Sequence, residues 1–380
     1  MRSIYMDHSA TTPVDPRVFE AMKPYYTCEF GNASSVHRKG QAARKAVETG
    51  REQIAALINA NPQEIVFTSG GTESDNQAII TFALNNGKQG KHLITSAIEH
   101  HAVLESFHYL ERCGYDVTIL PVNAQGMVEP ETLAGAIRPD TILVSVMHAN
   151  NEIGTVQPIE ELAAISHKAG AVFHTDAVQT VGKLPIDVRR MGIDMLSASS
   201  HKLYGPKGIG CLYVKKGVRI SNLLYGGGQE SKLRAGTENV PGIVGLGKAA
   251  EIAGQEMQQR ADLLTRLGKR LREGIINSIP NAIFTGHPDQ RVPGSVSVCF
   301  QFADGEPILL MLDSYGIMAS SGSACVCGAL DPSPVLLAIG LPHEIARGSL
   351  RLTLGKDNTE EDVDYTLEVL PKLIANLRRM

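Results

Sequence analysis

Two residues of opposite charge follow two apolar runs of the sequence. Asp176 lies near the end of the run AVFHTDAV, and Lys202 comes two residues after DMLSASS, in the string SSHKLYGP. A carboxylate at the end of an apolar strand costs free energy unless a cation or a hydrogen-bond donor meets it. One interpretation is a structural salt bridge between neighbouring strand ends, which is the common arrangement for such a pair. The other is a reactive lysine with an acidic partner.

A glycine-rich turn follows a third apolar run, EIVFTS. Gly70 and Gly71 let backbone N–H groups converge where a helix begins, and Thr72 adds a hydroxyl, which is typical of a phosphate site. An ordinary strand-to-helix turn with a capping threonine has the same composition. A fourth run, KHLITSAI, is followed by His100 and His101. An imidazole at that point could stack on a flat ring or move protons.

Together these residues match what pyridoxal phosphate (PLP) requires of a protein. PLP needs a lysine for a Schiff base, an acid at the pyridine nitrogen, a phosphate site and a flat group over the ring. The acid matters because a protonated pyridine ring is the better electron sink, and an aspartate stabilises that proton by charge pairing. We therefore predict a PLP site built from Lys202, Asp176, the Gly71–Thr72 turn and either His100 or His101, between which spacing alone does not choose.

A thiol adds a further possibility for chemistry. Cys325 lies in the run SSGSACVCG (320–328), which has little to pack and therefore predicts a loop with a reactive, exposed thiol. The alternatives are an ordinary surface cysteine or half of a metal site. A metal needs about four ligands, and the nearest other Cys and His residues, Cys299 and His343, have no ligand-like spacing. We expect no metal site.

Composition narrows the class of protein. The 380 residues carry 36 Lys+Arg and 40 Asp+Glu, a net charge of −4, and this balance argues against a nucleic-acid-binding surface. No apolar stretch approaches the roughly 20 residues of a membrane span, and MRSIYMDHSATTP lacks the features of a signal peptide. We expect a cytoplasmic protein that binds no membrane, with four cysteines acting as small buried apolar residues: Cys28, Cys113, Cys211 and Cys299.

The pattern of elements predicts how these side chains are positioned. Helical segments, including 100–114 and 159–170, alternate with apolar runs rich in β-branched residues, which is typical of a mostly parallel sheet with flanking helices. Ligands bind at the carboxyl ends of the strands in such a sheet, so the candidate residues should meet at one edge. The seven predicted strands are 64–69, 91–98, 115–122, 141–149, 171–178, 194–200 and 208–216.

The remaining sequence predicts a second, smaller α/β domain. A long helical pattern over 244–278 is expected to bridge the two domains, followed by a strand over 295–300, a helix from Glu306 and a loop over 320–333. The string Thr359-Glu-Glu-Asp362 is a capping box that begins the last helix, and Pro371 is expected to kink or stop that helix near Leu370. We predict a large domain over 15–255 and a small domain formed by 1–14 and 256–380.

Eleven strings, in this order, resemble those of cysteine desulfurases of the NifS/IscS type, and they span nearly the whole chain. The resemblance implies a fold-type I PLP enzyme, whose large domain has a mainly parallel seven-stranded sheet flanked by helices. The strings are YMDHSATTP (5–13), FGNASSVH (30–37), TSGGTESDN (68–76), IEHHAV (98–103), NNEIG (150–154), HTDAVQ (174–179), SSHKLYGPKG (199–208), GGGQE (226–230), RAGTEN (234–239), SSGSAC (320–325) and LRLTLG (350–355).

The resemblance also implies an activity, the removal of sulfur from L-cysteine to leave alanine and a persulfide on Cys325. Lys202 would form the Schiff base, and His100, rather than His101, would stack on the ring and move a proton. Arg351 would clamp the substrate carboxylate together with Asn32. The residues implied around the cofactor are Gly71, Thr72, Asn151, Ser199 and His201, with Asp176 at the pyridine nitrogen, Gln179 at the phenolic oxygen, and Thr237 reaching the phosphate from a partner subunit.

The resemblance further implies a homodimer with the active site at its interface, and a protein that accepts the sulfur, such as an iron–sulfur scaffold. Cys327 stands where the family commonly has Ser or Thr, and it could accept the persulfide or form a disulfide with Cys325. The sequence ends without the extension that some relatives use to dock a scaffold. Alternative readings are a selenocysteine lyase, another PLP-dependent C–S lyase or aminotransferase, or a non-catalytic sulfur carrier on a PLP fold.

Overall fold

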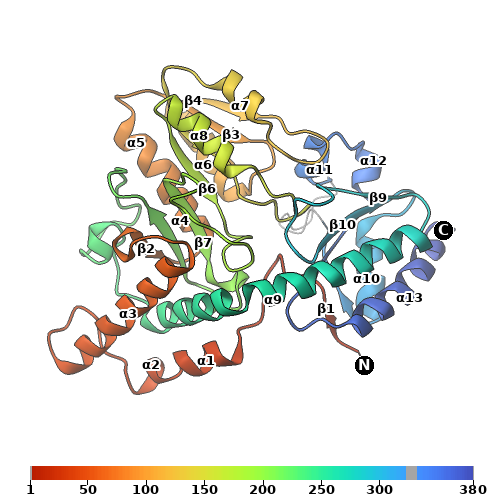
Figure 1. Cartoon of the computed structure of the whole chain (residues 1–380), viewed down its shortest axis with the longest axis horizontal. Coiled ribbons are helices and arrows are strands. Elements are labelled where there is room, and N and C mark those ends of the chain that lie inside the picture. Colours follow the sequence, from red (N-terminus) through yellow and green to blue (C-terminus); the bar gives the residue numbers. More distant parts are fainter. Residues whose placement is uncertain (1, 322–331, 380) are drawn as a thin grey trace.

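The computed structural model describes residues 2–321 and 332–379. A seven-stranded sheet forms the larger part of the chain (Figure 1). All strands run parallel except β8, which is antiparallel to both of its neighbours. Each predicted strand is confirmed, and the order across the sheet is β2 (Ile65–Thr68), β8 (Gly210–Val214), β7 (Met195–Ser199), β6 (Val172–Asp176), β5 (Thr141–Ser145), β3 (His92–Ser96) and β4 (Asp116–Leu120).

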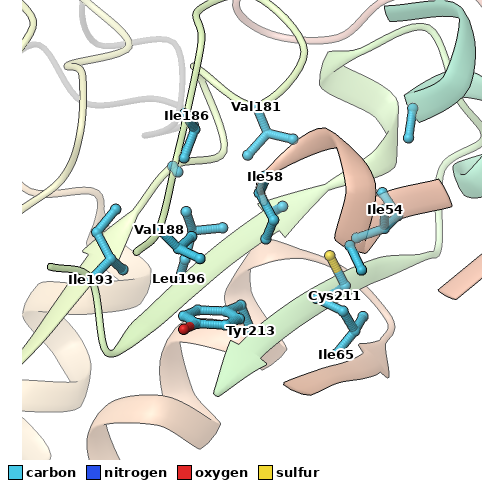
Figure 2. Close-up of a cluster of buried hydrophobic side chains, with 14 of the residues drawn as sticks. Ile54, Ile58, Ile65, Val181, Ile186, Val188, Ile193, Leu196, Cys211 and Tyr213 are labelled. Carbon is cyan, nitrogen blue, oxygen red and sulfur yellow. The ribbon is translucent and has the colours of Figure 1, made fainter. Parts of the chain in front are cut away.

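Helices cover the sheet because its inner strands are buried along their whole length. Figure 2 shows one such contact, in which Ile54 of α3 and Ile58, which follows that helix, lie over Leu196 and Cys211 of the sheet. The larger part holds α1 (Pro16–Met22), α2 (Pro24–Thr27), α3 (Arg38–Leu57), η1 (Pro62–Glu64), α4 (Gly71–Asn76), the π-helix η2 (Gln77–Thr81), α5 (Phe82–Asn86), α6 (His101–Arg112), α7 (Pro130–Ala136), α8 (Ile159–Lys168), η3 (Ser200–Lys202) and η4 (Glu230–Lys232).

The smaller part contains two further sheets, and both chain ends lie there (Figure 1). An antiparallel sheet has the order β12 (Ser349–Thr353), β10 (Ser295–Phe300), β9 (Ala282–Phe284). A parallel pair joins β1 (Ile4–Tyr5) to β11 (Ile317–Met318). The helices of this part are α10 (Gly305–Ser314), α11 (Pro334–Ala338), α12 (His343–Ala346) and α13 (Glu360–Leu377).

The 39-residue helix α9 (Val240–Ser278) connects the two parts (Figure 1). It packs against α1 and α3 of the larger part and against α13 of the smaller one. Its residues from Val240 to Ala253 belong to the core beneath the large sheet, and Leu267, Leu271 and Ile275 belong to a separate core of the smaller part. These two cores agree with a division near residue 255, and the exact domain bounds stay a prediction.

Most local predictions are confirmed, but the last helix does not stop near Leu370, which was one of the two effects expected of Pro371. Gly114 and Gly170 follow α6 and α8 with φ of 83° and 81°, as left-handed caps. Thr359 and Asp362 form the capping box of α13. That helix continues through Pro371 to Leu377. The physical reason lies in its buried face, because Leu370, Leu373 and Ile374 pack in the core of the smaller part on both sides of the proline.

The four scattered cysteines divide into two kinds. Cys211 and Cys299 are buried as predicted, and burial raises the pKa of each thiol to about 12. Cys28 and Cys113 are exposed, so the prediction is wrong for them. Both follow the last residue of a helix, where the chain turns toward solvent. Among the described residues, none of the helices combines the length and apolarity needed to cross a membrane.

Candidate active site

Residues after five of the parallel strands meet in one cavity of about 310 Å³ at the carboxyl edge of the large sheet. Five strands end at this cavity: β2, β3, β5, β6 and β7. Reactive and polar side chains at or just after these strand ends line it. The smaller part adds Arg351 from β12. The lining is Ser9, Ala10, Gly71, Thr72, Asp75, His100, Met147, Asn151, Asp176, Val178, Gln179, Ser199, His201, Lys202 and Arg351.

Backbone oxygens of the N-terminal segment hold the amine of Lys202. Its Nζ donates to the carbonyl oxygen of Ala10 at 2.8 Å and to that of Ser9. The Nε2 atom of Gln179 donates to the same oxygen of Ser9 at 3.0 Å. Lys202 ends the one-turn helix η3, which directly follows β7. The N-terminal segment therefore fixes where this amine lies in the cavity.

Asp176 is the last residue of β6 and is 6% exposed. Its Oδ1 accepts the N–H of Val178 at 2.9 Å. Burial raises the pKa of this carboxyl, while the Val178 hydrogen bond and the charges of His100 and Lys202 act in the opposite direction. A cation bound in the cavity would favour the carboxylate further. The side chain is therefore suited to pair with a protonated ring nitrogen.

A second buried carboxyl, that of Asp75 on α4, lines the same cavity. Its Oδ1 has no hydrogen bond among the described residues and lies 3.7 Å from Nε2 of His174. Burial and the negative charge of Asp176 raise the pKa of Asp75 well above its usual range. Because the charge of Asp176 opposes ionisation of Asp75, we expect Asp75 to keep its proton when Asp176 is charged.

The cavity distinguishes the two neighbouring histidines. His100 lines it, whereas His101 is exposed and lies outside the lining. As the N-cap of α6, His100 accepts the N–H of Ala102 on Nδ1 at 3.1 Å, so the neutral ring carries its proton on Nε2. Burial lowers the pKa of His100 and thereby favours that neutral form.

Small donors gather where β2 and β7 end. An open depression of about 540 Å³ adjoins the first cavity and is lined by Gly70, Gly71, Thr72, Ser199, His201 and Lys207, among others. A Cβ on Gly71 would lie 2.7 Å from Cγ2 of Val178, so only glycine allows this turn to approach the strand end so closely. Hydroxyls, an imidazole, a lysine and the first N–H groups of a helix are the donors that suit a phosphate.

Arg351 of β12 brings a buried guanidinium to the cavity. It is 3% exposed, Nη1 donates to the backbone oxygen of Asn151 at 3.1 Å, and Nη2 pairs with Oδ1 of Asp7 at 2.8 Å. Its Nε is buried without a hydrogen-bond partner among the described residues. The group therefore retains donor capacity, and its planar fork matches a carboxylate.

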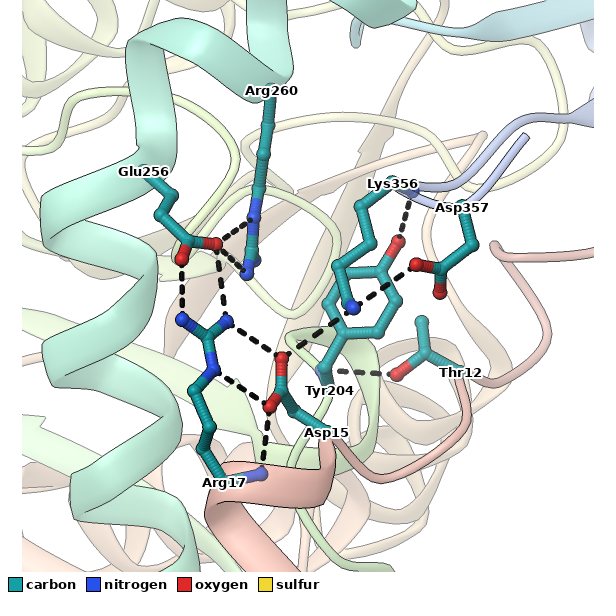
Figure 3. Close-up of polar contacts among 8 residues, drawn as sticks. All are labelled: Thr12, Asp15, Arg17, Tyr204, Glu256, Arg260, Lys356 and Asp357. Atoms are coloured by element: carbon teal, nitrogen blue, oxygen red, sulfur yellow. Dashed lines mark hydrogen bonds and ion pairs between the residues drawn. The ribbon is translucent and has the colours of Figure 1, made fainter. Parts of the chain in front are cut away.

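A network of ion pairs and hydrogen bonds holds the segment that carries Ser9 and Ala10 (Figure 3). Arg17 pairs with Asp15 at 2.9 Å and with Glu256 of α9 at 2.6 Å. Thr12 Oγ1 donates to the carbonyl oxygen of His201 at 2.9 Å and accepts the N–H of Tyr204 at the same distance. The backbone that receives Lys202 is thus tied both to α9 and to the turn after η3.

The structure brings together most, but not all, of the predicted site residues. Asn32 is exposed in the segment between α2 and α3, where its Oδ1 accepts the N–H of Ser34 at 2.8 Å, and it is not part of the cavity lining. Thr237 is exposed and also lies outside the lining. Cys325 and Cys327 fall outside the described residues. Within the described ranges, no group of three or more His, Cys, Asp or Glu side chains could hold a metal ion.

Some lining residues were not named from the sequence. Ser9 and Ala10 stand in the string YMDHSATTP, but they act through backbone carbonyl groups, for which side-chain type gives no signal. Asp75 stands in TSGGTESDN, and an acid within a predicted buried helix face was the available signal for it. Asp7 had no signal, because its partner Arg351 is 344 positions away.

Comparisons with known proteins agree with this geometry. Residues 4–366 match the family model described as aminotransferase class-V. The cysteine desulfurase IscS of Methanosarcina thermophila is 54% identical over 379 residues, covering 100% of this chain and 94% of the relative. That of Dictyoglomus turgidum is 50% identical, covering 99% of this chain and 96% of the relative.

Solved structures give the same result. One titled NifS-like protein superimposes with a TM-score of 0.93 at 40% identity, covering 99% of this chain and all of that chain. A structure titled SspA in complex with cysteine superimposes with a TM-score of 0.82 at 40% identity, covering 94% and 100%. The chain belongs to the NifS/IscS-like cysteine desulfurases of the aminotransferase class-V family.

Proposed function

We propose that this protein is a PLP-dependent cysteine desulfurase, which converts L-cysteine to L-alanine and transfers the sulfur to Cys325 as a persulfide. The observation that carries the proposal is a single cavity that contains the amine of Lys202, the buried carboxyl of Asp176 and the guanidinium of Arg351. Full-length relatives named cysteine desulfurase and a neighbour solved with cysteine support the choice of substrate.

The residues of the cavity fit PLP by their chemistry. Lys202 would hold the cofactor covalently, Asp176 would pair with its pyridine nitrogen, and His100 would lie over the ring. Gln179 would donate to the phenolic oxygen. When bound, PLP supplies an electron sink for negative charge at the substrate Cα. The groups proposed for the phosphate are the Gly71–Thr72 turn, Ser199 and His201, with Asn151 beside the cofactor and Thr237 contributed by a partner subunit.

Two side chains of this chain would handle protons. Lys202 would take the proton from the substrate Cα, since its nitrogen lies in the same cavity. The neutral ring of His100 carries a proton on Nε2, which it could give to the substrate as the carbon–sulfur bond breaks. Arg351 would hold the substrate carboxylate with the donors that Asp7 and Asn151 leave unused. Asn32 has no contact with the cavity, so we assign the carboxylate to Arg351.

The sulfur transfer itself balances without an added oxidant or reductant. The thiolate of Cys325 would attack the substrate sulfur, so that an S–S bond forms while the Cβ–S bond breaks. The carbon fragment keeps the electron pair and, after gaining protons, leaves as alanine. L-Cysteine and one protein thiol thus become L-alanine and one persulfide, from which an acceptor protein, such as an iron–sulfur scaffold, would take the sulfur.

We also propose a cytoplasmic homodimer with Thr237 at its interface. Large apolar side chains are exposed on two segments of the larger part: Tyr26 is 62%, Phe30 70% and Tyr225 87% exposed. Exposed apolar groups of this size are typical of a protein interface. Two exposed, unpaired thiols, Cys28 and Cys113, suit a reducing compartment.

The activity can be tested with purified protein, PLP, L-cysteine and a thiol reductant. We expect alanine and sulfide in equal amounts. Lys202→Ala should lose the visible absorption band that PLP gives when bound, together with the activity. Cys325→Ala should keep the band but lose desulfuration. Cys113→Ala is a matched control, because it removes another exposed thiol away from the proposed interface and should leave the rate unchanged.

Other products would contradict the proposal. Pyruvate with ammonia would indicate a different C–S lyase, and a keto acid would indicate an aminotransferase. Alanine from selenocysteine but not from cysteine would indicate a selenocysteine lyase. A wild-type protein that gains no band with PLP would favour a non-catalytic carrier. A Cys325→Ala variant with the full rate would exclude this cysteine as the nucleophile.

A further inference from the structure

A second lysine, Lys183, contacts a residue of the cofactor cavity without lining the cavity itself. It is half-buried in the turn region that follows β6, and its Nζ donates to Oε1 of Gln179 at 3.4 Å. It forms no ion pair within the described part of the chain. Burial, together with the charges of Lys202 and Arg351, lowers the pKa of Lys183 to about 7. A poorly solvated amine without an anionic partner costs free energy, so its position calls for an explanation.

The neighbour of Lys183 suggests that explanation. Gln179 lines the cavity, is 6% exposed, and its side-chain amide has two chemically different ends. Its Oε1 faces the Lys183 amine at 3.4 Å, and its Nε2 donates to the oxygen of Ser9 at 3.0 Å. The Ser9 carbonyl oxygen can only accept, which directs Nε2 toward it, and the Lys183 amine donates to Oε1 on the other side, so the two contacts favour the same orientation of the amide. One hydrogen of the NH₂ group remains for a ligand.

We propose that Lys183 is a positioning residue of the cofactor site, which holds the Gln179 amide with its NH₂ group available to the phenolic oxygen of PLP. The inference rests on the proposed function, since it concerns that cofactor. Gln179 lines the cavity whereas Lys183 does not, so the lysine would act on a ligand there through this amide. A negative charge on the oxygen would therefore be stabilised by a hydrogen bond that the lysine polarises.

The test is spectroscopic and uses the full chain loaded with PLP. We expect Lys183→Met to reduce the fraction of the visible, long-wavelength form of bound PLP, in which the phenolic oxygen is negative, and to weaken PLP binding roughly fivefold to 20-fold. Lys183→Arg keeps a donor and a charge, so it should restore both properties to within about twofold of wild type. A merely structural lysine would not alter the spectrum of a protein that still binds PLP.

A double-mutant cycle identifies the route of the effect. Gln179→Met removes the amide, so adding Lys183→Met to it should change PLP affinity by less than about twofold. Lys215→Met is a matched control, because Lys215 is half-exposed and pairs with Asp194 rather than with a cavity residue. Circular dichroism and thermal unfolding would show that each variant folds.

Several results would overturn the inference. An unchanged spectrum in a folded Lys183→Met protein would do so, and so would an effect that persists in full without the Gln179 amide. If Lys183→Met does not fold, Lys183→Gln takes its place and the same outcomes apply. A wild-type protein that binds no PLP would overturn the proposed function as well. If the wild type binds PLP normally but Lys183→Met changes neither the spectrum nor the affinity, only this inference is overturned.

Discussion

Arg351 and Asp7 form an ion pair at the wall of the cavity, with 2.8 Å between Nη2 and Oδ1, although 344 positions of the chain separate them. The Arg351 side chain is almost fully buried, and that of Asp7 is 19% exposed. The aspartate thus neutralises the guanidinium from one side while the cavity lies on another. This pair connects the segment after β1 to β12 at the point where a substrate carboxylate would bind.

We predict that Asp7→Asn raises the KM for L-cysteine about threefold to tenfold and changes kcat less. The amide keeps the shape of the side chain but removes the charge that fixes the guanidinium, so substrate binding is weakened in the ground state and the transition state alike. Steady-state rates of alanine formation measure both constants. Asp357→Asn, an exposed aspartate, is the control. An unchanged KM in Asp7→Asn would show that Arg351 keeps its position without this partner.

The two carboxyls of the cavity should respond differently to the same substitution. Asp176→Asn removes a charge opposite the cofactor nitrogen, and we expect activity to fall on the order of 100-fold or more. Asp75→Asn should cost less than about fivefold, because an amide resembles the protonated carboxyl that its raised pKa indicates. Rates of alanine production at saturating PLP measure the loss of activity in each of the two variants. Equal losses would contradict the assignment of charge to Asp176.

Asp15 should stabilise the fold through its charge. The hydrogen bonds from Arg17, the first of several causes, hold the pKa of this buried carboxyl well below its usual range. Its stabilisation is therefore present above the pKa of about 4 that an aspartate has when unfolded, and it is lost as the pH falls toward the folded value. Asp15→Asn should lower the free energy of unfolding by about 1–2 kcal/mol at pH 7.

Urea unfolding of wild type and Asp15→Asn at pH 7 and at pH 3.5 checks this prediction. The difference between the two proteins should shrink at the lower pH. Asp357→Asn, at an exposed position beside Lys356, should show little difference at either pH. A gap that widened on acidification would contradict the assigned direction of the pKa shift.

Glu99 should make the stability of the fold depend on pH in the opposite direction from Asp15. Burial raises the pKa of this carboxyl from 4.5 to about 8, although it accepts hydrogen bonds from Ser96 and from the N–H of Met147. The folded state then binds a proton that the unfolded state has lost, so stability is fully present below about 4.5 and is lost as the pH rises through 8. Wild type should lose roughly 4 kcal/mol more than Glu99→Gln between pH 5 and pH 8.5. Parallel denaturant titrations at the two pH values measure this difference.

The pattern of apolar residues in the sequence was sufficient to predict the large sheet and the edge of it that carries the candidate site. Most strands of this sheet are buried and appear as continuous apolar runs, and the partly exposed edge strand β4 is recognisable by its β-branched residues. The rule that ligands bind at carboxyl ends placed Asp176, Lys202 and Gly71 together. The capping box at Thr359 and the glycines after α6 and α8 were predictable for a similar reason, because each depends on residues within one turn of the chain.

Contacts between distant parts of the chain needed the tertiary structure. The family resemblance already favoured His100 over His101, and the cavity lining agrees, but the carbonyl groups of Ser9 and Ala10 are backbone atoms that every residue possesses. The pairing of Asp7 with Arg351 and the passage of α13 through Pro371 depend on packing in the smaller part. Sequence by itself determined which residue types stand at the strand ends, because local burial and turn chemistry encode them. Only the folded chain decided which of them touch, because those contacts join segments whose sequences do not constrain one another.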